Sequence, residues 1–342
     1  MRFLVLTSVF ALISCSQENI TSEFQSISEQ LNPTQIFKVS PNTYTLVEGK
    51  LGTKILIDAN SFVFENEESV TSSVRLSLKE IYTFSEMIMN GLSTTSGADL
   101  LQTSGMINLK ASSDGKVVKL KSGSSIKISF KKMSDAPFMR TYLGIEDSTK
   151  IDWQLDTDNI YDTIRFTQYE KFTNTLSYGV DSDSTGDFLV TYGIVGLDTI
   201  ELDKEIQYPY LEYDSTYEVG IFPYYEIRST KLNWINCDYF RESEFNKISV
   251  SVNSFDQGNA RTFLIFKEYK SIMSPWEFLD GESVFINIPK ESEVTIFSVY
   301  KNDDVYFLAI EDKILIDNNE SIQLKYKKSN MKEIQEQLQY LD

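Results

Sequence analysis

Residues 70–81 read V-T-S-S-V-R-L-S-L-K-E-I, and from Val74 onward apolar and polar side chains alternate. This period of two is typical of a half-buried β-strand, because successive side chains point to opposite faces of a sheet. A second strong pattern lies downstream at Asp114-Gly115, a dipeptide that favours the tight turn of a hairpin, with apolar segments on both sides. Together the two patterns predict an antiparallel sheet.

A short helix is expected directly after the alternating strand. Thr83 and Glu86 have the spacing of a capping box, and Gly91 is suitably placed to end a helix of about two turns. Residues 126–130 alternate again. We therefore expect residues 40–133 to form an antiparallel β-sandwich with one helical crossover.

The C-terminal third repeats the strand pattern, with the regular spacing typical of a second β-sandwich. The expected strands are residues 248–252, 261–266, 284–288, 294–300 and 305–310. Ser329 or Asn330 is expected to cap a terminal helix that docks on this domain. Its apolar stripe consists of Met331, Ile334, Leu338 and Leu341.

The fold class that follows is mainly β, with two antiparallel β-sandwich domains, a short crossover helix and a C-terminal helix. The second domain is expected to span residues 218–342. Residues 134–217 have weak periodicity and many acidic, Ser and Thr residues, which predicts an acidic connector or an insertion. Residues 15–39 are polar with little to bury, and are expected to form a flexible tether.

Residues 1–14 have the features of a lipoprotein signal peptide. Arg2 precedes an apolar run, residues 3–13, that is too short to span a bilayer. The run ends at Ser14-Cys15, so cleavage before Cys15 would leave a cysteine whose acyl chains hold the mature protein on a membrane. The alternative is that these two residues end an ordinary signal peptide, and both interpretations export the chain.

Composition excludes several classes of function. The formal net charge of −18 opposes binding to nucleic acid or to an anionic lipid surface. The chain contains no histidine, which removes Ser-His-Asp and Cys-His catalysis and histidine-ligated zinc. Once Cys15 carries lipid, Cys237 has no partner for an intramolecular disulfide. We expect no cofactor.

Aromatic residues supply the candidates for ligand binding. Trp153 stands alone among polar neighbours, Trp234 and Asp238 belong to a dense cluster, and a tyrosine-rich run contains Tyr210 and Tyr224. Such rings can stack on a sugar or peptide, and a carboxylate can accept hydrogen bonds from hydroxyl groups. The competing interpretation places Trp234 in the core, Asp238 at a turn or cap, and the tyrosines in the alternation of a sheet.

A calcium loop is the one metal motif that the sequence imitates. Asp181, Asp183 and Asp187 stand at positions 1, 3 and 7 of an EF-hand-like segment, but position 12 is Tyr192 where a bidentate Glu is needed. A solvated turn is the favoured interpretation, and we expect no metal beyond a weak calcium site in this loop. A carboxylate-based hydrolase would need two acids facing each other across a cleft, which sequence adjacency does not indicate.

Three segments together carry a resemblance to a known family: G-T-K-I-L-I-D-A-N-S-F-V at 52–63, L-L-Q-T-S-G-M at 100–106 and L-N-W-I-N-C-D-Y-F at 232–240. They resemble a family of uncharacterised exported proteins and lipoproteins of Bacteroidota. The resemblance implies that the first domain is similar to the ZU5-like β-sandwich, whose usual roles are interdomain packing and protein interaction. It implies no catalytic residues.

The same resemblance implies a location in the outer membrane, with the cell surface slightly favoured over the periplasmic face because one acidic residue, Glu18, follows the cysteine closely. It also implies O-glycosylation where Asp precedes Ser or Thr and an apolar residue or Thr follows. The residues in that setting are Ser148, Thr163, Ser184, Thr199 and Ser215.

The function that we expect is that of a non-enzymatic, lipid-anchored cell-envelope protein that acts as a protein-interaction or scaffold module. A surface glycan-binding lipoprotein is the alternative. The expected partners are the membrane, through the lipid anchor, and other envelope proteins or glycans, but no nucleic acid.

Overall fold

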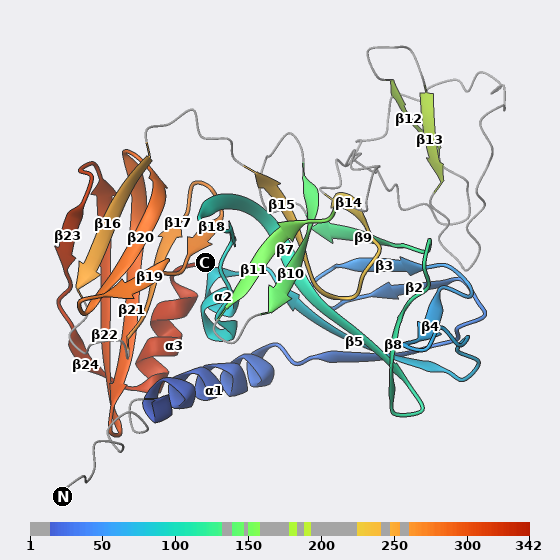
Figure 1. Ribbon diagram of the computed structural model, residues 1–342, viewed down its shortest axis with the longest axis horizontal. Coiled ribbons are helices and arrows are strands. Elements are labelled where there is room, and N and C mark those ends of the chain that lie inside the picture. Colours follow the sequence, from blue (N-terminus) through green and yellow to red (C-terminus); the bar gives the residue numbers. More distant parts are fainter. Residues whose placement is uncertain are drawn as a thin grey trace, which may run out of the picture.

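The structure is a computed structural model that describes residues 14–131, 139–146, 150–157, 178–182, 188–192, 224–240, 247–253 and 260–342. The expected mainly β fold is confirmed, since antiparallel sheets build two bodies that are joined by helices (Figure 1). β12 (Tyr178–Ser182) and β13 (Phe188–Tyr192) pair with each other in a two-stranded sheet.

The first body is a sandwich of a nine-stranded and a four-stranded sheet. The larger sheet contains β1 (Gln35–Val39), β4 (Phe62–Phe64), β5 (Val74–Ile81), β6 (Thr95–Ser96), β7 (Asp99–Ser113), β8 (Lys116–Leu120), β10 (Arg140–Glu146), β11 (Ile151–Leu155) and β15 (Asn233–Phe240). Its central order is β1-β5-β7-β15-β10-β11, with β6 and β8 paired to β7 and β4 paired to β8. The smaller sheet contains β2 (Thr45–Glu48), β3 (Lys54–Ile57), β9 (Ile126–Lys131) and β14 (Tyr224–Ser229), in the order β14-β9-β3-β2.

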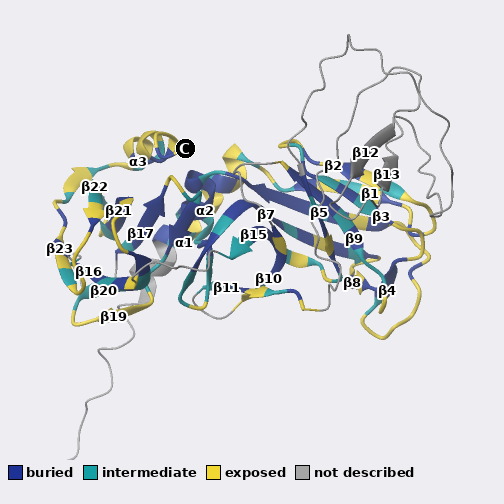
Figure 2. Cartoon of the chain, turned by 90° about the horizontal axis from the view of Figure 1, so that it is seen from above, coloured by how far each residue is buried: buried dark blue, intermediate teal, exposed yellow. Residues whose placement is uncertain are grey.

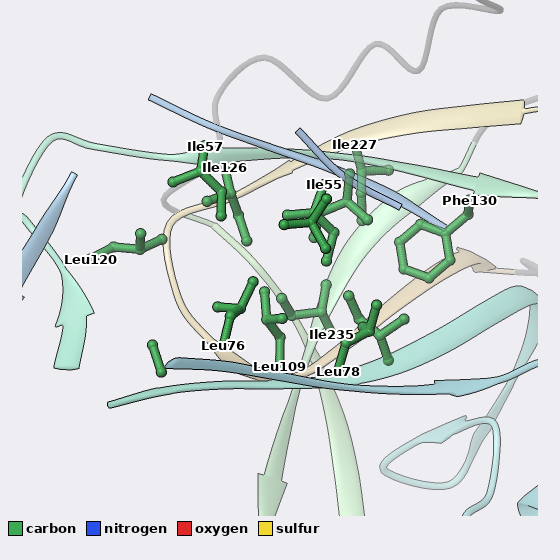
Figure 3. Packing of buried hydrophobic residues seen from close by; sticks show 14 of the residues in the cluster. Ile55, Ile57, Leu76, Leu78, Leu109, Leu120, Ile126, Phe130, Ile227 and Ile235 are labelled. Carbon is green, nitrogen blue, oxygen red and sulfur yellow. The ribbon is translucent and has the colours of Figure 1, made fainter. Parts of the chain in front are cut away.

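Apolar side chains from the inner faces of both sheets form the core of the first sandwich (Figure 3). Leu76 and Leu78 from β5 and Leu109 from β7 lie opposite Ile55 and Ile126 of the smaller sheet, and all five are buried. The alternating pattern of residues 74–78 therefore places its apolar side chains in the core, as the sequence predicts.

The second body is also a sandwich. One sheet contains β16 (Lys247–Asn253), β19 (Glu277–Leu279), β20 (Glu282–Pro289) and β23 (Glu320–Gln323), in the order β19-β20-β16-β23. The other contains β17 (Arg261–Phe266), β18 (Ser271–Met273), β21 (Ser292–Asn302), β22 (Val305–Leu315) and β24 (Lys327–Ser329), in the order β18-β17-β21-β22-β24. β16 and β23 are parallel, and the other pairs are antiparallel.

Three helices join the two bodies: α1 (Ser14–Leu31), α2 (Phe84–Asn90) and α3 (Met331–Gln339). Their buried side chains pack with those of the first body and with the outer face of the β18-β17-β21-β22-β24 sheet in one cluster, which we call the interbody core. Its buried members are Ile20, Phe24, Ile81, Phe84, Met87, Ile88, Met89, Leu92, Leu101, Met106, Tyr142, Trp153, Phe263, Ile265, Ile272, Phe297, Val299, Ile334, Leu338 and Leu341. Figure 2 shows α2 buried between the bodies, and α1 packs one face against α2 and β21.

The local sequence signals for α2 and for the β7–β8 hairpin are confirmed. The Thr83 hydroxyl accepts a hydrogen bond from the Glu86 backbone N–H at 3.2 Å, and Gly91 ends α2 in the left-handed conformation with φ of 69°. Asp114 and Gly115 adopt φ of 51° and 75°, as a tight hairpin turn requires.

The terminal helix also forms as expected. The Asn330 side chain accepts a hydrogen bond from the Glu333 backbone N–H at 3.1 Å. Ile334, Leu338 and Leu341 are buried in the interbody core, so the apolar stripe of α3 docks within the chain.

The flexible tether predicted for residues 15–39 is wrong. α1 and β1 occupy most of that segment, and Ile20 and Phe24 are fully buried. These two residues are four apart and therefore lie on one face of the helix. A few apolar residues at helical spacing are enough to fix this polar segment because α2 and β21 cover the same face.

The domain limits also differ from the prediction. β10 and β11 come from the predicted connector, residues 134–217, yet they extend the larger sheet of the first body. β14 and β15 come from the segment assigned to the second domain, residues 218–342, but they pair with β9 and β7 of the first. Local periodicity identifies a strand without identifying its distant partner, and this explains the error.

No helix among the residues described is long and apolar enough to cross a membrane.

Gly105 offers a test of how tightly the first body is packed. Its φ is +130°, and a Cβ at this position would lie 2.4 Å from Cε1 of Tyr82. Gly105→Ala should lower the free energy of unfolding by about 3 kcal/mol or more, because backbone strain and overpacking each cost about 1–3 kcal/mol. Urea denaturation measures the change.

Gly97→Ala is the matched control, because Gly97 also has a positive φ but its Cβ would meet nothing within 4 Å. We expect a loss of about 1 kcal/mol from the backbone alone. Equal losses for the two variants would show that the contact with Tyr82 contributes nothing.

Candidate functional site

Trp153 lies in the interbody core and not on a surface. Its side chain is fully buried, and its Nε1 donates a hydrogen bond to the Ser93 carbonyl at 2.6 Å. Trp234 packs against it edge-to-face, with ring centroids 6.4 Å apart, and donates from Nε1 to Glu146 Oε1 at 2.8 Å. The prediction that Trp153 stacks on a sugar is therefore wrong, since a ring needs an open face to do so.

For several other predicted positions, the structure does not describe the side chain. Tyr224 lies in β14 and Asp181 in β12, but the structure does not describe either side chain. The remaining positions of this kind are Tyr210, Asp183, Asp187, Ser148, Thr163, Ser184, Thr199 and Ser215. Ligand binding, calcium binding and glycosylation at these positions stay predictions. Within the described parts of the chain, no group of three or more Cys, Asp or Glu side chains could hold a metal ion.

Asp238 is fully buried in a polar cluster at a β-bulge, so its predicted place at a turn or cap is wrong. The register between β15 and β7 shifts between Asn236 and Asp238. The Asn236 amide donates to Asp238 Oδ2 at 2.6 Å, and the Thr103 hydroxyl donates to Asn236 Oδ1 at 2.9 Å. Asp238 Oδ1 has no hydrogen-bond partner among the residues described.

Burial raises the pKa of Asp238 well above its ordinary value, and a hydrogen bond with Thr103 lowers that pKa by less. A carboxyl group in this environment holds its proton at pH values where an exposed aspartate is ionised. Such a shift identifies candidate catalytic acids, but a catalytic acid must also reach a substrate.

A small pocket that is lined in part by Thr103 lies at the start of α2. It is lined by Tyr82, Thr83, Phe84, Met87, Thr103, Gly105, Lys270 and Asp342, and its cavity volume is about 40 Å³. This space suits one water molecule and is far smaller than the several hundred Å³ of a typical ligand site. The Asp342 side chain accepts hydrogen bonds from the backbone N–H and hydroxyl of Ser85, so it caps α2. The pocket therefore resembles a packing defect more than an active site.

The polar groups of greatest consequence hold α1 in place. Lys79 is buried and donates to the carbonyls of Ser28 and Asn32 at the end of α1, and it forms an ion pair with Glu29 at 3.2 Å. A cation is favourable there because the C-terminal end of a helix carries a partial negative charge. Burial raises the pKa of Glu29, but hydrogen bonds from Thr34 and Lys79 outweigh this effect and lower the pKa overall.

A second contact holds the middle of α1 against the second body. Lys301 of β21 donates to Glu23 Oε1 at 2.6 Å, and the Tyr306 hydroxyl of β22 donates to Glu23 Oε2. Burial raises the pKa of Glu23. The hydrogen bonds from Lys301 and Tyr306 lower it by a larger amount, so the pKa lies below its ordinary value.

Arg261 lies where α1, α2 and β17 meet. Its guanidinium carbon is 5.6 Å from the ring centroid of Phe24 and 5.7 Å from that of Phe263, beside Gly91 at the end of α2. Burial lowers the pKa of Arg261 to about 10, so the group is still cationic at neutral pH. Two aromatic faces stabilise this buried charge.

The second body carries an exposed apolar patch that the sequence pattern did not predict. Trp276 is 45% exposed, and Phe278 and Leu279 in the edge strand β19 are 48% and 56% exposed. The Lys150 ammonium lies 4.9 Å from the centroid of the Trp276 ring. Residues 275–281, P-W-E-F-L-D-G, carried the available signal, which is a short apolar run before an Asp-Gly turn.

The fold and these contacts define a class of protein: two β-sandwiches joined by helices whose apolar faces pack between them. Searches of family models, of curated proteins and of solved structures find no match to the chain.

Glu23→Gln should destabilise the chain by about 1 kcal/mol at neutral pH, because it weakens a charge-assisted contact between α1 and the second body. Since the pKa of Glu23 is lowered on folding, its contribution is present above pH 4.5, the ordinary value, and is lost as the pH falls through the folded pKa. Urea unfolding at pH 7 and pH 3.5 should therefore show a larger difference between wild type and variant at the higher pH.

Glu336→Gln is the control for this experiment, because its ion pair with Lys332 is exposed and should contribute little. The assignment would be wrong if the two variants lost equal stability at neutral pH.

Asp238→Asn tests the buried acid. Because its pKa is raised on folding, the folded chain keeps a proton that the unfolded chain releases above about pH 3.8, so this group makes stability fall as the pH rises. The neutral amide removes that dependence. Thermal unfolding at pH 5 and pH 8 should show a smaller drop in Tm for the variant than for wild type.

Asp114→Asn makes the same chemical change at an exposed hairpin turn and is the control for the loss of one carboxyl group. Parallel curves for Asp238→Asn and wild type would mean that Asp238 is ionised in the folded chain.

Proposed function

We propose that this chain is a non-enzymatic, lipid-anchored envelope protein that acts as an interaction or scaffold module. The observation that carries the proposal is the position of α1: the helix begins at Ser14, beside the cysteine of the lipoprotein-type signal, and its side chains from Ile20 onward are built into the interbody core.

Because α1 is packed against both bodies, a lipid on Cys15 would be attached close to the folded structure. Five residue steps separate Cys15 from the buried Ile20. They span about 7.5 Å as a helix and at most about 18 Å when fully extended. A chain lipidated at Cys15 is thereby held with its two sandwiches at the membrane surface, which suits a scaffold that presents a fixed face to its partners.

Surface features support interaction in preference to catalysis. Two hollows among the described residues have volumes of about 40 Å³ and about 20 Å³, which is too small for a typical ligand. Exposed apolar side chains include Phe278 and Leu279 on the edge strand β19, where a partner can reach them. For the glycan-binding alternative, burial removes Trp153, and no contact among the described side chains favours it.

Lipidation of Cys15 is the test of the proposal. Wild-type chain expressed in a diderm bacterium and labelled with an alkyne fatty acid should carry the label and partition with the membrane fraction. Cys15→Ala should lose both properties, and Ser16→Ala should keep both. A wild-type chain that carries no label would contradict the proposal.

Protease treatment of intact and lysed cells then distinguishes the outer-membrane surface from its periplasmic face. We expect degradation in intact cells, in keeping with surface display. Protection until lysis would place the scaffold on the periplasmic side.

A further inference from the structure

α1 is a helix that its own sequence supports poorly. Five of its 18 residues are Ser, and it has neither an acidic residue in its first turn nor a basic residue in its last turn. Ser has a lower helix propensity than Ala or Leu, and such ends leave the helix dipole without compensation. Among its described side chains, those that are buried are Ile20, Phe24 and Ser28. α1 is therefore helical chiefly because it is packed against the rest of the chain.

The strand pairs of the two sandwiches do not include α1, which lies outside both sheets of each body (Figure 1). After Leu31 the chain reaches β1 through three residues, of which the middle one is Pro33. β1 pairs with β5 independently of α1. Elements with few buried apolar side chains and an exposed backbone are the first to open in a folded protein. We therefore expect α1 to open transiently while the sandwiches stay folded.

The surface that α1 covers, which we call the α1 site, is cationic where it is polar. α1 itself carries three Glu residues and no basic residue. Glu23 meets Lys301 at 2.6 Å, and Glu29 meets Lys79 at 3.2 Å. The α1 site consists of apolar side chains of α2 and β21 in the interbody core, together with Lys79, Asn90, Arg261, Lys301 and Tyr306. Its chemistry is that of a site for an acidic amphipathic helix.

Arg261 is the part of the α1 site that α1 does not satisfy. Its Nη1 is buried and has no hydrogen-bond partner among the described residues. α1 presents the ring of Phe24, whose centroid is 5.6 Å from the guanidinium carbon. An aromatic ring stabilises the charge, but a carboxylate also accepts hydrogen bonds from the guanidinium N–H groups. A helix that places a carboxylate beside Arg261 would therefore fit the α1 site better than α1 does.

We propose that α1 is an opening strap over a binding site for an acidic amphipathic helix of a partner protein. The inference rests on the proposed function, because it names the kind of partner that the interaction module takes. When α1 opens, the partner helix replaces it. The partner helix then fills the apolar positions that Ile20 and Phe24 leave, and its carboxylate pairs with Arg261.

Hydrogen–deuterium exchange of the full chain, with or without lipid on Cys15, tests the opening of the strap. The backbone amides of residues 20–31 should exchange at least about 100-fold faster than those of β7, because local opening requires less free energy than global unfolding. Glu23→Gln should speed exchange in α1 by about fivefold, because it weakens the contact with Lys301. Glu336→Gln, which removes an exposed ion pair on α3, is the control and should leave exchange in α1 unchanged.

A fluorescein-labelled peptide of residues 16–31 tests the α1 site in solution. Its fluorescence anisotropy is followed during titration with the full chain that carries Ile20→Ala, a change that weakens the strap by removing a buried side chain. The peptide should bind, and the same peptide with Phe24→Ala should bind more weakly. Circular dichroism of the Ile20→Ala chain verifies that the sandwiches are folded.

Two further peptides test the role of Arg261. Ser28 lies one turn after Phe24, and its hydroxyl accepts a hydrogen bond from Asn90, the residue before Gly91. The guanidinium of Arg261 lies beside Gly91. A Ser28→Asp peptide should therefore bind about tenfold more tightly than the Ser28→Asn peptide, which has the same shape without the charge.

Rapid exchange in α1 together with tighter binding of the Ser28→Asp peptide supports the inference. Exchange in α1 that is no faster than in β7 overturns the strap, and equal affinity of the Asp and Asn peptides overturns the assignment of an acidic partner. A wild-type dimer that exchanges α1 between copies, detected by light scattering, would assign the site to a second copy and also overturn that assignment. These measurements do not depend on lipid, so the labelling of Cys15 still tests the proposed function separately.

Discussion

Packing of one face of α1 against α2 and β21 is the contact on which the rest of the structure depends. Ile20 and Phe24 reach into a core that both bodies share. Lys79 fixes the C-terminal end of the helix, and the chain continues from there into β1 at the edge of the larger sheet. Removal of the helix would expose apolar side chains on both bodies at once, so a segment without strong hydrophobicity controls how the sandwiches are joined.

Polar contacts around α1 fix the position of the helix. Apolar packing alone would allow the helix to shift along the interface. Glu23 contacts the second body, while Asn32 donates to the Glu80 carbonyl and to the Glu86 carboxylate of the first. Glu80 itself is fully buried and accepts hydrogen bonds from Gln35 and from the turn before β3. A shift of the helix by one turn would leave several of these buried groups without partners, at about 1–3 kcal/mol each.

The sequence predicts local structure well where a few neighbouring residues decide it. Thr83 with Glu86 and Gly91 defines α2, and the stripe that includes Ile334 and Leu338 defines the docking of α3. The sequence does not predict which other elements a helix or strand packs against. α1 has only three apolar residues in its buried turns, at 20, 24 and 27, so composition suggests a tether although their spacing is helical. Trp153 likewise has polar neighbours in the chain but apolar ones in space.

The packing of α1 has a physical consequence for the segment that the sequence predicts to be a tether. A long flexible linker lets a body of net charge −18 turn any face toward the lipid or move away from it. With α1 built into the interbody core, residues from Ile20 onward keep a fixed orientation relative to both bodies. If Cys15 carries lipid, as we propose, the same packing sets how the two bodies are held at the membrane.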